Sequence, residues 1–284
     1  MKKYMENTYL IFGGNYGNLE ATKALYSKAE ELAIPRRNII CTGDMAAYCA
    51  DAEQVADFVR QWGIQVIQGN CEQAIAENAS DCGCGFSEET VCDTLSKQWY
   101  EYCQSVISNE TKEWFARLPK TVRISCNNFE VLVCHGSPNN INRFVFFSDP
   151  EDKWQVLFAE ANADIIIAGH CGIPFTKLGR YHAWHNSGAL GMPANDGTPR
   201  VWFSTMVISD AQVSFNHHTL EYEYTETQKK MQKNGLSEEY IKALAEGYWP
   251  SLDILPLLEQ KKQGMPLKEC TYIWDKSHKE QYYG

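Results

Sequence analysis

The sequence lacks an excess of basic residues, and this absence limits the partners it can have. Its 284 residues include 26 Lys and Arg against 36 Asp and Glu, a formal net charge of −10. Binding to nucleic acid or to an anionic membrane surface normally requires a basic face, so we expect neither as a partner. A small phosphorylated ligand stays compatible with this charge, because a local site can be positive on an acidic protein.

Long apolar runs are missing as well. The run near the N-terminus, residues 9–12, is short and leads directly into a strand pattern, so it does not match the apolar region of a signal peptide. No segment approaches the length of a transmembrane helix. The sequence also contains no internal repeat and no low-complexity linker. We therefore expect a cytoplasmic protein with one main domain and a C-terminal extension.

Cysteine, by contrast, is abundant. The chain has 11 cysteines, an odd number, and without an export signal they are expected to be free thiols in a reducing compartment. Cys82, Cys84 and Cys92 could form a thiolate cluster. However, the sequence offers no fourth ligand at a recognisable zinc spacing, which favours ordinary thiols.

Four short apolar runs each end at a polar residue beside a glycine. In open α/β sheets, binding sites form at the carboxyl ends of the strands, where a side chain faces a crevice rather than the core. The four endings could therefore converge on one metal ion. They are Gly43-Asp44, Gly69-Asn70, His135-Gly136 and Gly169-His170.

The first part of the chain alternates between strand-like and helix-like patterns. Asn18 is a suitable N-cap for the first helix. The alternation predicts right-handed crossovers and a mainly parallel first sheet. The predicted strands cover residues 9–13, 39–43 and 65–69, and the predicted helices cover residues 19–32 and 52–62.

Residues 73–118 interrupt this alternation and predict a helical insertion, with one helix over residues 90–107. Residues 121–126 and 130–134 then predict a hairpin around Asn127-Asn128. A helix near residues 152–161 leads to the strand that ends at Gly169.

Short strand patterns from residue 174 to about residue 224 predict a second, more antiparallel sheet packed on the first. Residues 225–249 predict two helices, the second beginning at Ser237. From residue 251 onward the tail is expected to be irregular.

The order and spacing of the four strand endings resemble the calcineurin-like metallophosphoesterase superfamily. The resemblance runs from Tyr9 to about Ile208. Ile173-Pro174-Phe175 and residues 186–191 are similar to its bacterial diadenosine tetraphosphatase-like or protein-phosphatase-like branch. The resemblance implies an α/β fold, a four-layer α/β/β/α sandwich over residues 1–224, with a C-terminal helical extension and tail over residues 225–284.

The resemblance also implies a two-metal chemistry in which a metal-activated hydroxide attacks a phosphoester in line. In that family the residues corresponding to Asp44, Asn70, His135 and His170 hold the second metal, and Asp44 bridges both ions. The first-metal motif is degenerate, because its three remaining ligands correspond to Gly14, Tyr16 and Gly172 here. The histidine that assists the leaving group corresponds to Cys71.

One divalent ion per chain, Mn, Fe or Zn, is therefore expected at Asp44, Asn70, His135 and His170. Asp44 and His135 are the candidate catalytic residues, with Cys71 as a third that acts as nucleophile or thiolate ligand. The other interpretation treats the four residues as turn and N-cap residues retained from an ancestor. Cys71 is then only a small residue in the place of the histidine.

Candidate substrate-binding residues lie in two segments. The turn over residues 13–17, with Gly14, Asn15 and Asn18, precedes a helix and could present backbone N–H groups to a phosphate, or it is only a tight turn. Arg143 could clamp a phosphate bidentately, or it is simply exposed to solvent.

Five further histidines are expected to be structural. His182 and His185 are expected to pack on the same side of a strand. The other three, His217, His218 and His278, are expected at the surface.

Two functions remain open. One is an atypical single-metal hydrolase acting on a small phosphorylated substrate or nucleotide. The other is a catalytically inactive pseudo-phosphoesterase that serves as a nucleotide-binding, phosphate-binding or regulatory module.

Overall fold

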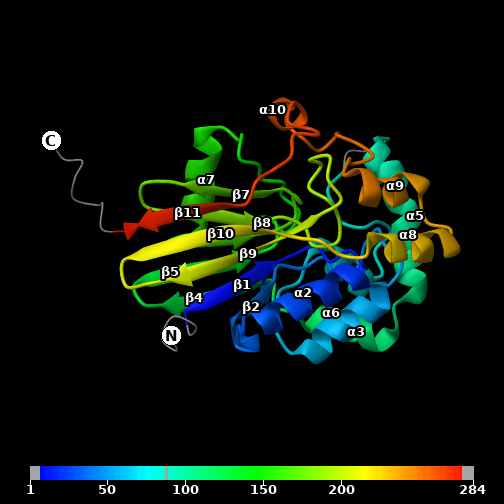
Figure 1. Ribbon diagram of the computed structural model, residues 1–284, viewed down its shortest axis with the longest axis horizontal. Helices are drawn as coiled ribbons and strands as arrows, with labels where there is room; N and C mark the ends of the chain where they lie inside the picture. Colours follow the sequence, from blue (N-terminus) through cyan, green and yellow to red (C-terminus); the bar gives the residue numbers. More distant parts are fainter. Residues whose placement is uncertain (1–6, 87–88, 277–284) are drawn as a thin grey trace.

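The computed structural model describes residues 7–86 and 89–276, which fold around two β-sheets (Figure 1). The first, sheet A, contains in spatial order β11 (Cys270–Asp275), β10 (Gln212–Leu220), β9 (Val201–Ile208), β1 (Thr8–Phe12), β2 (Ile39–Cys41) and β3 (Gln65–Val66). The second, sheet B, contains β4 (Thr121–Cys126), β5 (Phe129–Cys134), β6 (Ile165–Ala168), β8 (Ala183–Ser187) and β7 (Pro174–Leu178).

The helices follow the predicted order. Asn18 caps the first of them, as predicted, because its side chain accepts a hydrogen bond from the Ala21 N–H. Their bounds are α2 (Leu19–Glu31), α3 (Ala52–Trp62), α4 (Asn70–Glu77), α5 (Val91–Val106), α6 (Asn109–Arg117), α7 (Glu151–Ala161), α8 (Tyr224–Lys233), α9 (Glu238–Glu246) and α10 (Leu257–Gln260), with a 3₁₀ turn η1 (Arg36–Asn38).

Alternation along the central strands produces the layers. Ile11 of β1 faces the core between the sheets, where it joins Val131 and Ile167 of sheet B. Its neighbour Leu10 faces the other way, into a core shared with helices such as α2 and α3. Sheet B is covered on its outer face by α7, through Trp154 and its neighbours. The predicted four-layer α/β/β/α sandwich is confirmed.

Three of the five strand pairings in sheet A are antiparallel, so the expectation of a mainly parallel first sheet is wrong. β1 pairs in parallel with β2 on one side and antiparallel with β9 on the other. Of the four strands between residues 174 and 224, which were expected to form the second sheet, β9 and β10 join sheet A, and only β7 and β8 join sheet B. Alternating apolar residues show that a segment is a half-buried strand, but they do not specify which free edge it will pair with.

The tail from residue 251 onward was expected to be irregular. Instead, the end of the described chain adds an edge strand to sheet A. β11 pairs antiparallel with β10 along its whole length. Trp274 is buried in the core between the sheets, where its ring packs 5.8 Å from that of Phe129. This tryptophan explains why the segment returns to the sandwich after α10.

Two of the histidines lie elsewhere than expected. His217, expected at the surface, is 2% exposed and lies beside His185 in a polar cluster between the sheets. His182 and His185 face opposite sides, since His182 stacks on Phe158 of α7. Their odd separation along an extended chain explains this difference. His278 lies outside the described residues.

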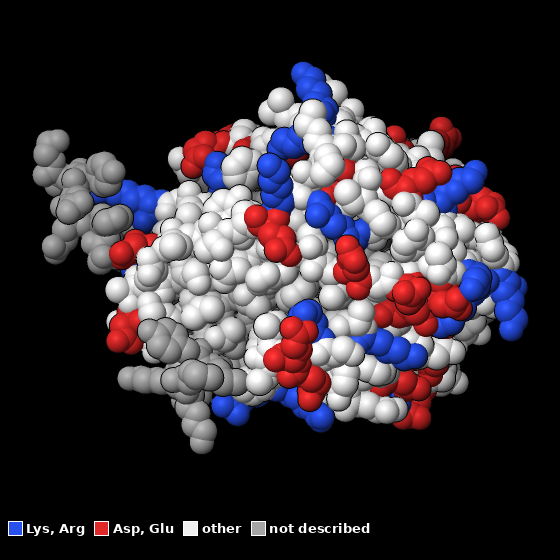
Figure 2. All heavy atoms as spheres, in the orientation of Figure 1, with Lys and Arg blue, Asp and Glu red and all other residues white. Residues whose placement is uncertain are grey.

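On the face of the molecule shown in Figure 2, acidic and basic side chains are interspersed and form no continuous basic patch. Within residues 7–86 and 89–276, no helix has both the length and the apolar character needed to cross a membrane.

Candidate metal centre

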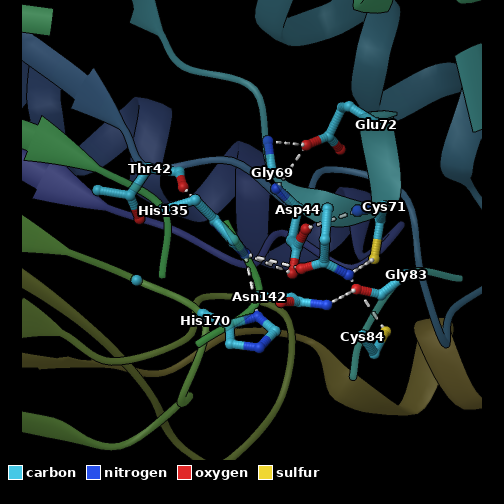
Figure 3. Close-up of polar contacts among 12 residues, drawn as sticks. Thr42, Asp44, Gly69, Cys71, Glu72, Gly83, Cys84, His135, Asn142 and His170 are labelled. Carbon is cyan, nitrogen blue, oxygen red and sulfur yellow. Dashed lines mark hydrogen bonds and ion pairs between the residues drawn. The ribbon is translucent and has the colours of Figure 1, made fainter. Parts of the chain in front are cut away.

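The four predicted strand-end residues come together at one edge of the two sheets. Figure 3 labels three of them, Asp44, His135 and His170. Asp44 follows β2, Asn70 opens α4 just after β3, His135 follows β5, and His170 follows β6. Because these strands run in parallel within each sheet, their carboxyl ends meet at a common crevice.

The donor atoms of this group converge on a small volume. His135 Nε2 lies 3.1 Å from Asp44 Oδ2, 3.0 Å from Asn70 Oδ1 and 3.2 Å from His170 Nδ1. The ligand atoms of Asp44, His135 and His170 all lie within 4.8 Å of one another. A carboxylate oxygen, an amide oxygen and two imidazole nitrogens form a donor set that suits Mn, Fe or Zn.

Thr42 fixes the orientation of the central imidazole. Its carbonyl lies 2.6 Å from His135 Nδ1, and a carbonyl only accepts, so Nδ1 carries the hydrogen. In the neutral ring, the lone pair of Nε2 then faces the other donors. This is the arrangement by which proteins orient metal-binding histidines.

The loop that carries Cys82 and Cys84 orients Asn70 in a similar way. The Asn70 amide nitrogen donates to the Cys82 carbonyl at 3.1 Å and to Cys84 Sγ at 3.3 Å. Its oxygen is thereby turned towards His135. Within the described residues these cysteines are free thiols, and they act on the centre through Asn70.

The electrostatics of the centre favour a cation. Burial alone would raise the pKa of Asp44, but the adjacent His135 lowers it below its usual range. Burial alone would lower the pKa of His135, and the Asp44 carboxylate raises it instead. The pKa of His170 falls to about 3, through burial and the neighbouring His135, so this imidazole is neutral and able to ligate.

Asp44 and His170 both have left-handed backbone conformations, with φ of 59° and 63°. This region is unfavourable for most non-glycine residues, although Asp, Asn and His adopt it more readily than others. The surrounding hydrogen bonds must therefore hold both residues in place. Such local strain is concentrated at functional sites.

Glu72 helps to hold the backbone of Asp44 in place, and this role was not predicted from the sequence. Its carboxylate is fully buried and accepts from the backbone N–H groups of Asp44 at 2.7 Å, Met45 at 2.6 Å and Gly69 at 2.9 Å. Burial raises its pKa to about 7. The available signal was its position three residues after Gly69, where a capping-box glutamate is expected.

An aromatic ring fills the space at Gly14 and Tyr16, two of the positions that the family resemblance assigns to the first metal. A Cβ at Gly14 would lie 2.6 Å from Cζ of Tyr16, so the glycine and the tyrosine fit together. Tyr16 is almost fully buried, and burial raises the pKa of its phenol well above the usual range. Its ring packs edge-on against Tyr48, which in turn packs on Tyr240 of α9.

Gly172 is enclosed in the same manner. A Cβ there would lie 3.2 Å from Cζ2 of Trp249, whose indole N–H donates to the Pro193 carbonyl at 2.7 Å. Residues from the C-terminal extension therefore occupy the space beside the positions that lack ligands.

A cavity of about 70 Å³ opens in front of Asp44 and His170. No lysine or arginine is among the described residues that line it. Its walls are mainly aromatic and sulfur-containing, including Tyr16, Tyr48, Cys84, Phe86, Phe144 and Trp249.

Cys71 is placed beside the centre but is poorly suited to nucleophilic chemistry. Its backbone N–H donates to Asp44 Oδ1 at 3.2 Å, while its side chain is buried and does not line the cavity. Burial raises the pKa of its thiol well above the usual range. The structure thus supports the interpretation of Cys71 as a small filler residue.

The turn over residues 13–17 does not offer the predicted phosphate cradle. The N–H groups of Gly14, Tyr16 and Gly17 donate to the carbonyls of residues 43, 44 and 45. Asn15 and Asn18 are fully buried, and their amides bond to other parts of the fold. Glycine at 14 and 17, both at positive φ, allows the tight turn that these bonds require.

Arg143 is also directed elsewhere. Its guanidinium lies 3.8 Å from the Glu160 carboxylate, and it is not among the residues that line the cavity. The structure thus gives no support to a phosphate clamp at this residue.

Comparison with protein families matches residues 15–213 to the calcineurin-like phosphoesterase superfamily domain. An uncharacterised protein of Methanocaldococcus jannaschii is 22% identical over 241 residues, which cover 78% of this chain and 91% of that protein.

Two solved structures share the fold. A metallophosphoesterase from Sphaerobacter thermophilus matches with a TM-score of 0.65 and 22% identity, over 84% of this chain and 98% of the other. A hypothetical protein from Pyrococcus horikoshii OT3 matches with a TM-score of 0.71 and 18% identity, over 85% and 99% of the two chains.

Proposed function

The chain belongs to the calcineurin-like phosphoesterase superfamily, and on that premise we propose that it hydrolyses a small phosphoester with one divalent metal ion. Asp44, Asn70, His135 and His170 would hold this ion. The observation that carries the proposal is the convergence of their four donor atoms, with His135 and Asn70 each oriented by a second contact on the far side.

The ion, when bound, would supply Lewis acidity towards a phosphoryl oxygen and lower the pKa of a water molecule. The protein residues have complementary tasks. Thr42 keeps the hydrogen of His135 on Nδ1, and Glu72 anchors the backbone of Asp44. Phe144 stacks on the His170 imidazole with ring centroids 4.1 Å apart, and it shields that ring from water.

A single ion is favoured over two because Gly14, Tyr16 and Gly172 offer no ligand for a first metal. The substrate is expected to be small and weakly charged, since the cavity is about 70 Å³ and no described lining residue is a lysine or arginine. A polyphosphate would find little there to balance its charge.

Elemental analysis combined with a hydrolysis assay tests the proposal. We expect about one equivalent of Mn, Fe or Zn per chain and metal-dependent hydrolysis of phosphomonoesters or phosphodiesters, both lost in His170→Ala. His182→Ala is the matched control, because His182 lies outside the centre and bonds to the Ala163 carbonyl. Two equivalents of metal in the wild type would refute the single-ion site.

The aromatic filling of the first-metal half supports a second candidate, a pseudo-phosphoesterase that binds a phosphate compound or nucleotide without cleaving it. Tyr16 and Trp249 occupy space where the family would place the ligands of the first metal. The same assays separate the two functions. Retained metal and measurable ligand binding without turnover, across phosphomonoesters, phosphodiesters and dinucleoside polyphosphates, would favour the pseudo-phosphoesterase.

A further inference from the structure

The strand β11 lies at one edge of sheet A, beside β10 and with no strand on its other side within the described residues (Figure 1). Its side chains alternate between two faces. Trp274 is buried in the core between the sheets, whereas Ile273, on the opposite face, is 56% exposed. The strand therefore brings an uncovered apolar side chain to an open edge of the sheet.

The backbone of β11 directs hydrogen-bonding groups towards this open edge. The Lys276 N–H donates to the carbonyl of Ala211, just before β10, at 3.0 Å. In an antiparallel pair, residues bonded to the neighbouring strand alternate with residues whose N–H and C=O point away from it. Thr271 and Ile273 belong to this second set, and their N–H groups make no hydrogen bond within residues 7–86 and 89–276. The edge thus offers donors and acceptors at the spacing that a further strand requires.

The features that protect other edge strands are absent from β11. Natural proteins keep free edges from pairing through short strands, proline or charged side chains, lysine above all. Among the other edge strands, β3 has 2 residues, β4 contains Arg123, and β7 contains Pro174 and Lys177. β11 has 6 residues without proline, lysine or arginine, and its one charged residue, Asp275, is the last. Among the described edge strands, β11 is therefore the best suited to pair with another chain.

We propose that β11 pairs antiparallel with β11 of a second copy of this chain, so that sheet A continues across a symmetric dimer. A twofold axis perpendicular to the sheet relates the two strands, so the pairing is centred on one residue that meets its own copy. The central candidates are Thr271, Tyr272 and Ile273. A second copy fits because β11 is complementary to itself in one of these three registers.

Charge excludes the register centred on Tyr272. This register would place Glu269 opposite the partner's Asp275. It would also place Lys268 opposite the partner's Lys276. Like charges directly opposite each other destabilise a sheet, so this pairing is unfavourable.

The register centred on Ile273 has no such conflict between residues 270 and 276. Ile273 meets the partner's Ile273 on the outer face, which covers the exposed apolar side chain. On the inner face Tyr272 lies opposite the partner's Trp274, and cross-strand aromatic pairs stabilise sheets. Centring on Thr271 would instead place Glu269 opposite the partner's Ile273, a carboxylate against an apolar side chain. Pairing about Ile273 is therefore favoured.

Analytical ultracentrifugation of the full chain tests the dimer. We expect twice the 32.4 kDa mass of one chain, in the wild type and in Asp44→Asn, because none of the four metal-set residues lies on β11. Ile273→Pro should give a monomer, since proline removes an N–H on the open side and leaves the bonds to β10 in place. A wild-type monomer at about 100 µM, or a dimer that survives Ile273→Pro, would overturn the proposal.

Ile273→Lys keeps the backbone N–H groups of β11 and keeps the test decisive if Ile273→Pro folds poorly. It sets two like charges opposite each other, so the affinity of the dimer should fall at least about tenfold. Val156→Lys is the matched control, because Val156 is 48% exposed but lies on α7. Equal affinities in these two variants would contradict an interface at β11.

Introduced cysteines test the register, in a background where Cys270→Ser removes the exposed thiol of β11. With Ile273→Cys, the two new thiols face each other across the twofold axis, and a Cα separation of about 5.5 Å permits a disulfide. Thr271→Cys is the control, because its copies do not face each other in this register. Oxidation with copper–phenanthroline should cross-link only the first protein on a non-reducing gel. Cross-linking of Thr271→Cys alone would refute pairing about Ile273.

Discussion

Asp44 lies between two halves of the strand-end site that differ in chemistry. On one side, Asn70, His135 and His170 present polar atoms, and contacts behind Asn70 and His135 hold them in orientation. On the other side, Gly14 and Gly172 leave room for the rings of Tyr16 and Trp249. Aromatic rings therefore fill the space beside these two glycines. One half presents converging polar atoms, while the other packs as core.

The largest effect is expected from Asp44→Asn, which breaks the polar half. The variant keeps the shape and tolerates the left-handed backbone, but it removes the carboxylate charge. Metal affinity should fall by more than about 100-fold, since even partners outside the coordination sphere change affinity by about 10 to 100-fold. Inductively coupled plasma mass spectrometry on dialysed protein measures the change.

Tyr16→Phe is the control for this prediction, because it removes a hydroxyl from the aromatic half. Its metal content should equal that of the wild type. Metal lost in Tyr16→Phe but kept in Asp44→Asn would invert our assignment of the two halves.

Glu72→Gln should weaken the frame of the polar half without touching a ligand. The amide NH₂ would face backbone N–H donors that now meet a carboxylate oxygen. The free energy of unfolding should fall by about 3 kcal/mol, in the range for breaking buried hydrogen bonds to a charged group. Urea denaturation followed by circular dichroism measures it.

Glu77→Gln, on the same helix but exposed, serves as the control and should change stability by less than about 0.5 kcal/mol. If both variants were equally stable, the buried carboxylate would not be anchoring the loop.

A double-mutant cycle tests whether Gly14 and Tyr16 fit together in the aromatic half. Gly14→Ala forces its Cβ against the tyrosine ring, and Tyr16→Ala removes that ring. The two changes should show a coupling energy of about 1–2 kcal/mol, so that Gly14→Ala costs less without the ring.

Gly63→Ala isolates the backbone contribution, because Gly63 also has a positive φ but an added Cβ would meet only the Gln61 carbonyl oxygen, at 4.0 Å. We expect it to cost about 1 kcal/mol and to show no coupling to Tyr16→Ala. Coupling below experimental error between Gly14 and Tyr16 would mean that the two residues changed independently.

The smallest expected effect is a change of stability with pH that comes from His217, a residue outside both halves of the strand-end site. The pKa of His217 is lowered to about 4 in the folded protein, below the unfolded value of about 6.5. The unfolded chain therefore binds the proton more strongly, and stability falls as the pH drops from about 6.5 towards about 4. Between about pH 7.5 and about pH 5.5 this loss should be about 1.3 kcal/mol for one imidazole.

Urea unfolding of Asp44→Asn and of Asp44→Asn with His217→Gln, at both pH values, isolates this contribution from the metal centre. The double variant should lose about 1.3 kcal/mol less on acidification. An identical loss in both proteins would mean that His217 does not stay neutral in the fold.

Much of the site could be predicted because its signals are local in the chain. A short apolar run that ends at a polar residue beside glycine defines both a strand and the side chain at its carboxyl end, as at Gly43-Asp44 and Gly169-His170. Glu72 carried a weaker signal, since a glutamate three residues after a helix start is also a common surface residue. Nothing near Arg143 in the sequence indicated that its guanidinium would turn to Glu160.

Local patterns were enough to predict the layered α/β architecture and the four strand-end residues that come together, because periodicity and strand ends depend on neighbours in the chain. Three features depend on tertiary contacts: β9 and β11 join sheet A, the Tyr16 ring packs against Gly14, and His217 is buried. These outcomes depend on which edge remained free and which distant side chains fitted the remaining space. Contacts between residues far apart in the sequence set both, and no local pattern encodes them.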